Sequence, residues 1–343
     1  MKYKITSFVI TESKKGLKSN EEILPLTSNK SAPHYFSQSI PAQFLLGNKK
    51  VEIEGNTIEL VAKMYKPDIV LVEGSIEVSD IFTDSILDLK TKILSSCHAF
   101  SKQYGGQEKI SEEYTIYQVS DYLIDPENFL TKEKDKIAEL LKSEKVTLDE
   151  TEIDYTLSFQ FKYDKNTLMI VDWDGAFAFD PSGVFVETIE LFELANYQLL
   201  RYRILDQILD NRIVRGSELA QTEGEKKWQV FPSKEITDEF RELINIRSRS
   251  IAQFEALDRD IKLIGDWYFA RLYELISKKF RLEGWSRNIR EKLESLQEIY
   301  TIAGENLGMS RTQRLELIQI WGFFILQIGW LVLIVLEFIY FTR

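Results

Sequence analysis

Two aspartates, Asp172 and Asp174, are the residues whose types and spacing best suit chemistry. Side chains two positions apart on a strand share a face, and a pair of carboxylates can hold Mg²⁺ for metal-dependent phosphate chemistry. The alternative interpretation is structural, because Asp174-Gly175 is the residue pair that a tight hairpin turn favours. No motif supplies a third ligand. We therefore expect no metal site and keep Asp172 and Asp174 as weak metal candidates.

Other patterns of catalysis are missing from the sequence. It contains no Gly-rich phosphate loop with Lys-Ser/Thr, no Gly-x-Ser-x-Gly, no His-Glu-x-x-His and no Cys-x-x-Cys. The chain has two histidines, His34 and His98, and one cysteine, Cys97, which excludes an internal disulfide. We expect that the protein is not an enzyme and has no catalytic residue and no cofactor. A Mg²⁺-dependent enzyme at Asp172 and Asp174 remains as an alternative.

Composition bounds the classes of protein that remain. The chain has 343 residues, of which 44% are hydrophobic and 28% are charged, as in ordinary globular proteins. At about 100–200 residues per domain, this length has room for two domains. The net charge of −11 would repel a phosphate backbone, so we expect no nucleic-acid partner.

The N-terminal half of the chain carries mixed strand and helix signals. Short apolar runs separated by Gly-Asn pairs predict a meander of antiparallel strands. Apolar residues at helical spacing predict helices over Ile81–Tyr104 and from Pro126 to about Ser143. Glu152–Lys162 alternates like a strand, and a hairpin is expected about Asp174-Gly175. These signals predict an antiparallel sheet with helices on one face.

After Gly183 the strand signals stop, so we predict an α+β fold in three parts. These are an N-terminal antiparallel-sheet domain with helices in residues 1–183, an all-helical hairpin or coiled-coil domain in 184–313, and one transmembrane helix in 314–343. In the last soluble segment apolar residues step by four and three, as in a coiled-coil seam. That soluble seam consists of Ile289, Leu293, Leu296, Tyr300, Ala303 and Leu307.

The predicted anchor contains twenty residues without a charge, Leu317–Leu336. At about 1.5 Å per residue, this run spans the roughly 30 Å hydrocarbon core of a bilayer. Little of the sequence follows the span and no signal peptide precedes it. We therefore expect a tail-anchored, single-pass membrane protein with its N-terminal body in the cytoplasm. Arg311 and Arg314, on the body side, agree with this orientation.

Small and polar residues follow one face of the span. Glycines let helices approach closely, and an amide in lipid is stabilised by bonding to a neighbouring helix. This pattern predicts a homo-oligomer that packs through a membrane seam. The membrane seam consists of Gln319, Gly322, Leu326, Gly329 and Leu333. Gln319 and Gln327 are the only lumen candidates if the oligomer instead forms a pore.

Residues 110–343 follow an order of elements that is found in one family. The helix and acidic stretch Asp125–Asp154 comes first, then the strand-rich stretch Tyr155–Phe179, then the helical run Thr188–Leu209, in which Ala195 and Gln198 occupy the place of the family's core. The junction RTQRLELIQIW is similar to that family's entry into its terminal helix. In these features the chain resembles the "required for meiotic nuclear division" family of membrane-anchored proteins. The resemblance implies an oligomeric, tail-anchored scaffold.

The function expected from these observations is that of a membrane-anchored, self-associating scaffold or interaction protein with a cytoplasmic α+β domain. Its expected partners are the membrane and further copies of itself. One alternative is a subunit of an oligomeric ion-permeable or membrane-perturbing effector. The other is the Mg²⁺-dependent enzyme described above.

Overall fold

The computed structural model describes residues 1–14, 43–225 and 267–341 of the chain. The described residues form two compact units. The first holds the whole β-sheet together with the helices that cover it, up to Leu205 and again around residues 267–287. The second begins at Asp206 in one long helix and at Asn288 in another.

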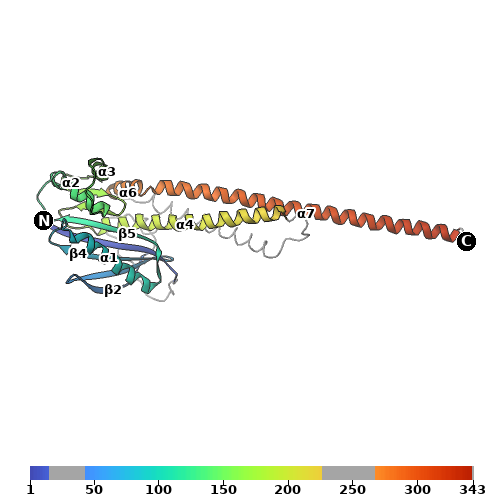
Figure 1. Ribbon diagram of the computed structural model, residues 1–343, viewed down its shortest axis with the longest axis horizontal. Helices are drawn as coiled ribbons and strands as arrows, with labels where there is room; N and C mark the ends of the chain where they lie inside the picture. Colours follow the sequence, from blue (N-terminus) through green and yellow to red (C-terminus); the bar gives the residue numbers. More distant parts are fainter. Residues whose placement is uncertain (15–42, 226–266, 342–343) are drawn as a thin grey trace. The chain divides into compact units, whose positions relative to one another are not determined.

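The first unit contains one eight-stranded sheet in the order β2-β3-β4-β1-β5-β8-β7-β6 (Figure 1). All neighbours are antiparallel except β5 and β8, which are parallel. This mixed sheet and the helices after it confirm the predicted α+β class. The strands are β1 (Lys2–Ser13), β2 (Gln43–Ile53), β3 (Asn56–Tyr65), β4 (Ile69–Val78), β5 (Gly106–Ser120), β6 (Gln160–Phe161), β7 (Leu168–Val171) and β8 (Gly175–Phe179).

The helices agree with most of the predicted ranges. They are α1 (Ser85–Ser101), the 3₁₀ turn η2 (Lys102–Tyr104), α2 (Pro126–Lys142), α3 (Glu150–Ser158), α4 (Val186–Glu225), α6 (Trp267–Lys279) and α7 (Leu282–Phe341). The strand predicted over Glu152–Lys162 is wrong, because α3 occupies most of it. Asp149 caps this helix by accepting from the Thr151 amide at 2.9 Å, and Ile153 and Thr156 are buried at helical spacing.

Both faces of the sheet are covered, whereas the sequence predicted helices on one face only. On one face α1 and α2 bury an apolar core against alternate residues of the strands, such as Val72 and Tyr117. On the other face Tyr114 of β5 stacks on Phe192 of α4 at 5.1 Å and meets Phe280, just after α6, at 5.6 Å between ring centroids. Tyr114 is fully buried, so this second layer is part of the same core.

A buried ionic cluster joins α4 to the sheet. The Lys63 ammonium of β3 lies 3.0 Å from a carboxylate oxygen of Glu193 on α4 and 3.2 Å from one of Glu73 on β4. The Tyr65 hydroxyl donates to Glu193 at 3.1 Å. Glu193 is completely buried, so its carboxyl group depends on these partners in place of water.

In the second unit, the later part of α4 and the early part of α7 lie side by side and run parallel. The Lys292 ammonium of α7 lies 2.6 Å from a carboxylate oxygen of Asp206 and 2.6 Å from one of Asp210, both on α4. About two turns further along both helices, a Cβ added at Gly216 of α4 would lie 3.0 Å from Ile299 of α7. The residue numbers of the contacts increase in the same direction along both helices, so the two helices are parallel. Most of the segment that connects these two helices, residues 226–266, lies outside the described residues, so the predicted hairpin stays a prediction.

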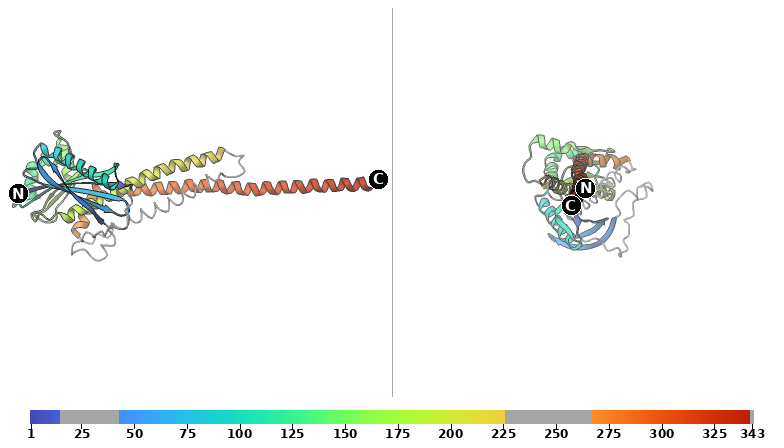
Figure 2. Two further views of the ribbon diagram at one scale, coloured as in Figure 1. Left: turned by 90° about the horizontal axis from the view of Figure 1, so that it is seen from below. Right: turned by 90° about the vertical axis from the view of Figure 1, so that its right-hand side faces the viewer.

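α7 is a single helix of 60 residues, coloured from orange to red in Figure 2. Its final part, Leu315–Phe341, is the one helix among the described residues that is long and apolar enough to cross a membrane. This segment has 27 residues and a mean hydropathy of 2.3, and none of its most apolar window is buried. As expected, α7 continues into this apolar segment without a break.

Candidate functional site

Asp172 and Asp174 lie in the turn between β7 and β8, as the sequence predicted, but the turn differs in detail. The Asp172 amide donates to the Gly175 carbonyl at 2.8 Å, so Trp173 and Asp174 occupy its centre. Asp174-Gly175 was the expected centre. Gly175 instead begins β8, where an added Cβ would lie 2.7 Å from the Thr115 carbonyl oxygen of β5. The close approach of the parallel strands therefore requires glycine here.

Asp172 belongs to an ion-pair cluster rather than to an open site. Its side chain is buried and lies 2.5 Å from the Lys279 ammonium of α6 and 3.4 Å from that of Lys142 on α2. The Lys279 ammonium also faces the rings of Tyr155 and Phe159. Two cations already neutralise this carboxylate, which leaves no net negative charge to attract Mg²⁺. Among the residues that the structure describes, no three His, Cys, Asp or Glu side chains are grouped to hold a metal.

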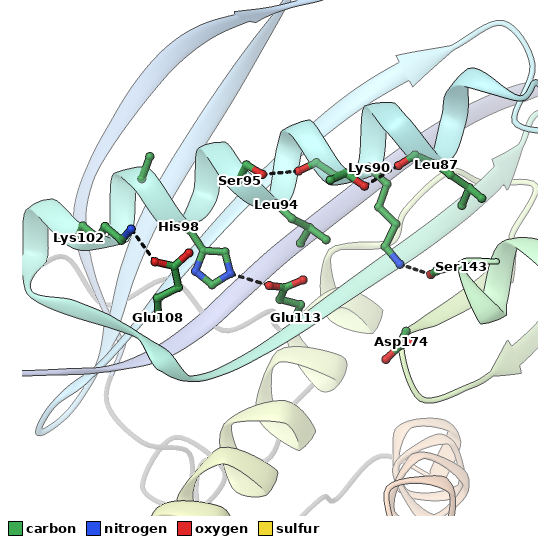
Figure 3. Close-up of a pocket in the computed structure, with 12 residues that line it drawn as sticks. Leu87, Lys90, Leu94, Ser95, His98, Lys102, Glu108, Glu113, Ser143 and Asp174 are labelled. Carbon is green, nitrogen blue, oxygen red and sulfur yellow. Dashed lines mark hydrogen bonds and ion pairs between the residues drawn. The ribbon is translucent and has the colours of Figure 1, made fainter. Parts of the chain in front are cut away.

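Asp174 faces a different neighbourhood, a polar pocket of about 680 Å³ between α1, β5 and the end of α2 (Figure 3). This volume is in the range of small-molecule sites. One flank of α1 supplies most of the wall, with residues that recur every three or four positions. The polar pocket is lined by Leu87, Lys90, Thr91, Leu94, Ser95, His98, Ala99, Lys102, Glu108, Glu113, Ser143 and Asp174.

Lys90 is the unusual cation of the polar pocket. It is 7% exposed, and its ammonium donates to the Ser143 hydroxyl. Ser143 follows α2 in a left-handed conformation at φ 57°, which turns the chain at the end of that helix toward α1. Among the described residues no carboxylate lies within ion-pair distance of Lys90. Burial accordingly lowers the pKa of this lysine, although Asp174 and Glu113 act against that effect.

The remaining charges of the polar pocket are arranged in pairs. His98 is 8% exposed, and its Nε2 lies 2.6 Å from a carboxylate oxygen of Glu113 on β5. That hydrogen bond holds the pKa of Glu113 below its ordinary value. Lys102 and Glu108 pair at 2.7 Å nearer the solvent. Within the described part of the chain, the buried Nδ1 of His98 has no hydrogen-bond partner.

Asp174 is fixed by its backbone while its carboxylate stays open to the polar pocket. Its carbonyl accepts from the Thr115 amide at 3.2 Å, which ties the turn to β5. No side chain in the described ranges forms an ion pair or a hydrogen bond with its carboxylate. Partial desolvation at the pocket wall raises the pKa of Asp174, although the residue as a whole is exposed, and Lys90 is the strongest of the cations that oppose this.

The predicted soluble seam is used inside the chain where the structure describes it. Ile289, Leu293 and Leu296 are buried in the helix that runs beside α4. The side chains of Tyr300, Ala303 and Leu307 lie outside the described residues. These three positions lie in the helix beside α4, and the packing of the seam as a whole stays a prediction.

The predicted membrane seam has no covering within the described chain. Gln319, Leu326 and Leu333 are exposed, and a Cβ added at Gly322 or Gly329 would meet nothing within 4 Å. The described ranges therefore contain no packing partner for this face. His34, one of the two histidines in the sequence, lies outside the described residues.

Sequence reasoning missed the polar pocket because its members are scattered. Lys90, His98 and Glu113 come from two elements, and none belongs to a motif. One signal was present, since Lys90 occupies the flank of the α1 stripe formed by Leu87 and Leu94, where an apolar residue would be expected.

The polar pocket and the sheet around it fall within a stretch that matches a protein-family model. The model is described as "Uncharacterized protein MJ0711, N-terminal domain", and residues 10–185 match it. This match covers more than half of the chain. The chain belongs to the MJ0711 N-terminal-domain family. Every pocket-lining residue lies inside the matched stretch, so the pocket is built wholly from the MJ0711 N-terminal domain.

A relative extends the similarity beyond the MJ0711 N-terminal domain. The chain is 27% identical over 250 residues to "Uncharacterized protein MJ0711" of Methanocaldococcus jannaschii, and the match covers 73% of this chain and 74% of that protein. No solved structure matches the chain significantly. The resemblance to the "required for meiotic nuclear division" family is not tested by these matches and stays a prediction.

Proposed function

We propose that the chain is a membrane-anchored, self-associating scaffold that presents its α+β domain in the cytoplasm. The observation that carries this proposal is the segment Leu315–Phe341, a 27-residue helix with a mean hydropathy of 2.3. Its length of about 40 Å, at about 1.5 Å per residue, exceeds the hydrocarbon core. A core helix of a soluble protein would be mostly buried, whereas no residue of this segment is buried.

Charge supports the orientation. Arg311 and Arg314 precede the span on the side of the body, and Arg343 follows it. Cytoplasmic flanks carry an excess of Lys and Arg, so the greater number of arginines favours a cytoplasmic body. Trp321 and Tyr340 lie near the two ends of the span, where amphipathic rings prefer the membrane interface.

Self-association is supported by the contrast between the two seams. The described part of the soluble seam is buried against α4, so its packing requirement is met within the chain. The membrane seam is open at Gly322 and Gly329, and close packing at such glycines is the usual basis of helix association in lipid. A symmetric homo-oligomer is the commonest way to satisfy such a face.

The anchor is tested by introducing charge into the middle of the span. In the double variant Ile325→Arg with Val332→Arg, each arginine costs about 2.5–3.5 kcal/mol near the centre of an inserted helix. We expect wild type to remain in the membrane pellet after carbonate washing and this variant to be released. Ile325→Leu with Val332→Leu is the matched control and should stay in the pellet.

Two results would contradict this proposal. Release of wild type by carbonate would exclude a transmembrane anchor. Protection of the body from protease added outside sealed vesicles whose cytoplasmic face is outward would reverse the orientation.

A further inference from the structure

The polar pocket contains a cation and an anion that are not paired with each other. Lys90 is 7% exposed and has one hydrogen-bond partner among the described residues, the hydroxyl of Ser143. An ammonium group carries three donors, so two remain for other partners. A buried charge with so few partners is costly unless something else in the site compensates it.

A simple anion would not satisfy this arrangement. Asp174 and Glu113 both line the same pocket, and they are the carboxylates that act most strongly on Lys90. An anionic ligand seated on Lys90 would also meet the unpaired carboxylate of Asp174, which lines the same pocket below Lys90 in Figure 3. Glu113 is less repulsive, because it is paired with His98 at 2.6 Å. The ligand must therefore carry a positive group on the side that faces Asp174.

Other polar atoms around the pocket are consistent with a ligand that carries both a positive and a negative group. His98 Nδ1 has no partner among the described residues, but it is buried and has no surface open to a ligand. Near the mouth, the hydroxyls of Thr91 and Ser95 already donate to carbonyls of their own helix at 2.9 and 2.8 Å. Their oxygens are left as acceptors, which suits a ligand donor group.

We propose that the polar pocket binds a small zwitterion, with the ligand's carboxylate on Lys90 and its ammonium group on Asp174. The chemical class is that of an amino acid or an ω-amino acid. The cavity of about 680 Å³ has room for such a molecule together with water. This inference is independent of the proposed anchor, because every residue involved lies in the sheet-containing unit.

The test measures binding to the purified full-length protein in detergent by calorimetry. The probes are glycine, β-alanine and γ-aminobutyrate, which differ in the separation of their charges, with propionate and propylamine as singly charged analogues. We expect at least one zwitterion to bind in the millimolar range or more tightly, and each singly charged analogue at least tenfold more weakly. Lys90→Met should weaken zwitterion binding at least tenfold, whereas Lys92→Met, exposed on the same helix, should not.

Asp174→Asn gives a second readout that a purely structural role would not produce. This exposed side chain forms no described pair, so the variant should fold and melt like wild type. It should weaken zwitterion binding at least tenfold and at the same time strengthen propionate binding, since the opposing charge is gone. The proposal is overturned if no zwitterion binds at about 10 mM, or if binding is unchanged in both Lys90→Met and Asp174→Asn. A negative result in these binding measurements would not bear on the membrane anchor, which is tested separately by carbonate washing.

Discussion

At Lys63 one ammonium group serves two carboxyl groups, those of Glu73 and Glu193, in the layer between the sheet and α4. Burial acts to raise the pKa of both acids. At Glu73 the nearby ammonium outweighs burial and the pKa lies below its ordinary value. At Glu193, which is completely buried, burial prevails and the pKa lies well above it. Burial therefore favours the protonated form of Glu193, whereas the ammonium of Lys63 favours the ionised form of Glu73.

This assignment predicts how the free energy of unfolding depends on pH. Below about 4.3, the ordinary pKa of glutamate, Glu193 is protonated in both folded and unfolded chains. As the pH rises above that value, the unfolded chain releases this proton while the folded chain keeps it, so stability is lost. Glu193→Gln removes this loss and keeps an acceptor for Tyr65. We expect the variant to gain stability relative to wild type between about pH 4.5 and 7, by up to about 1.4 kcal/mol per pH unit.

Urea unfolding of wild type and Glu193→Gln across that pH range checks the prediction. Glu52→Gln is the control, because Glu52 is exposed on β2 and should show no such trend. A stability difference between Glu193→Gln and wild type that stays constant or shrinks as the pH rises would mean that Glu193 is ionised in the folded protein.

At the scale of elements, the apolar part of α7 leads to a prediction about assembly. A Cβ added at Gly322 or Gly329 meets no atom of the described residues within 4 Å, so isoleucine at these positions should not disturb folding. They would instead hold a second helix away from this face. We expect Gly322→Ile with Gly329→Ile to reduce the mass of the detergent-solubilised particle, while the circular dichroism of the soluble part is unchanged. Leu331→Ile, outside the membrane seam, is the matched control.

Mass photometry or light scattering in mild detergent measures this outcome. Wild type that is monomeric at concentrations well above micromolar would contradict self-association through the span.

Most elements could be predicted from the sequence, and the exceptions have physical reasons. Turn chemistry and periodicity were sufficient for α1, α2 and the β7–β8 hairpin. Glu152–Lys162 was predicted as a strand because its apolar residues fit both a strand and a short helix. The structure has a helix here, and its N-terminus is stabilised by the cap at Asp149. The polar pocket could not be predicted, since its charges meet only when α1 packs beside β5.

At the scale of the whole molecule, the expected domain boundary at residue 183 differs from the division seen in the structure. The early part of α4 and α6 belong with the sheet. The reason is that Phe8, Tyr65 and Tyr114 face away from α1, and they are completely buried under the later helices. A strand with both faces buried shows no alternation, so the sequence does not reveal that a second layer of helices is needed.

This second layer predicts that the family-matched stretch is not stable alone. A fragment of residues 1–185 lacks α4 and α6 and would expose those aromatic rings, each of which contributes about 1.5–3 kcal/mol when buried. We expect this fragment to bind a hydrophobic dye and to aggregate, whereas a fragment of residues 1–296 should be folded. Near-ultraviolet circular dichroism and dye fluorescence distinguish the two. A monomeric fragment 1–185 with native dichroism would contradict the prediction.

The order of the sheet, the covering helices and the apolar helix along the chain also determines the order in which they are made during translation. The last strand of the sheet ends at Phe179, α6 ends at Lys279 and the apolar helix ends at Phe341. At about 5–20 residues per second, translation completes the span roughly 8–30 s after the last strand, but only roughly 3–12 s after α6. Until α6 has been made, the aromatic face of the sheet can be covered by α4 but lacks Phe280, which follows α6. Targeting of the span to a membrane then competes with the final closure of the body, so slowing translation after Lys279 should favour a body that is folded before it is anchored.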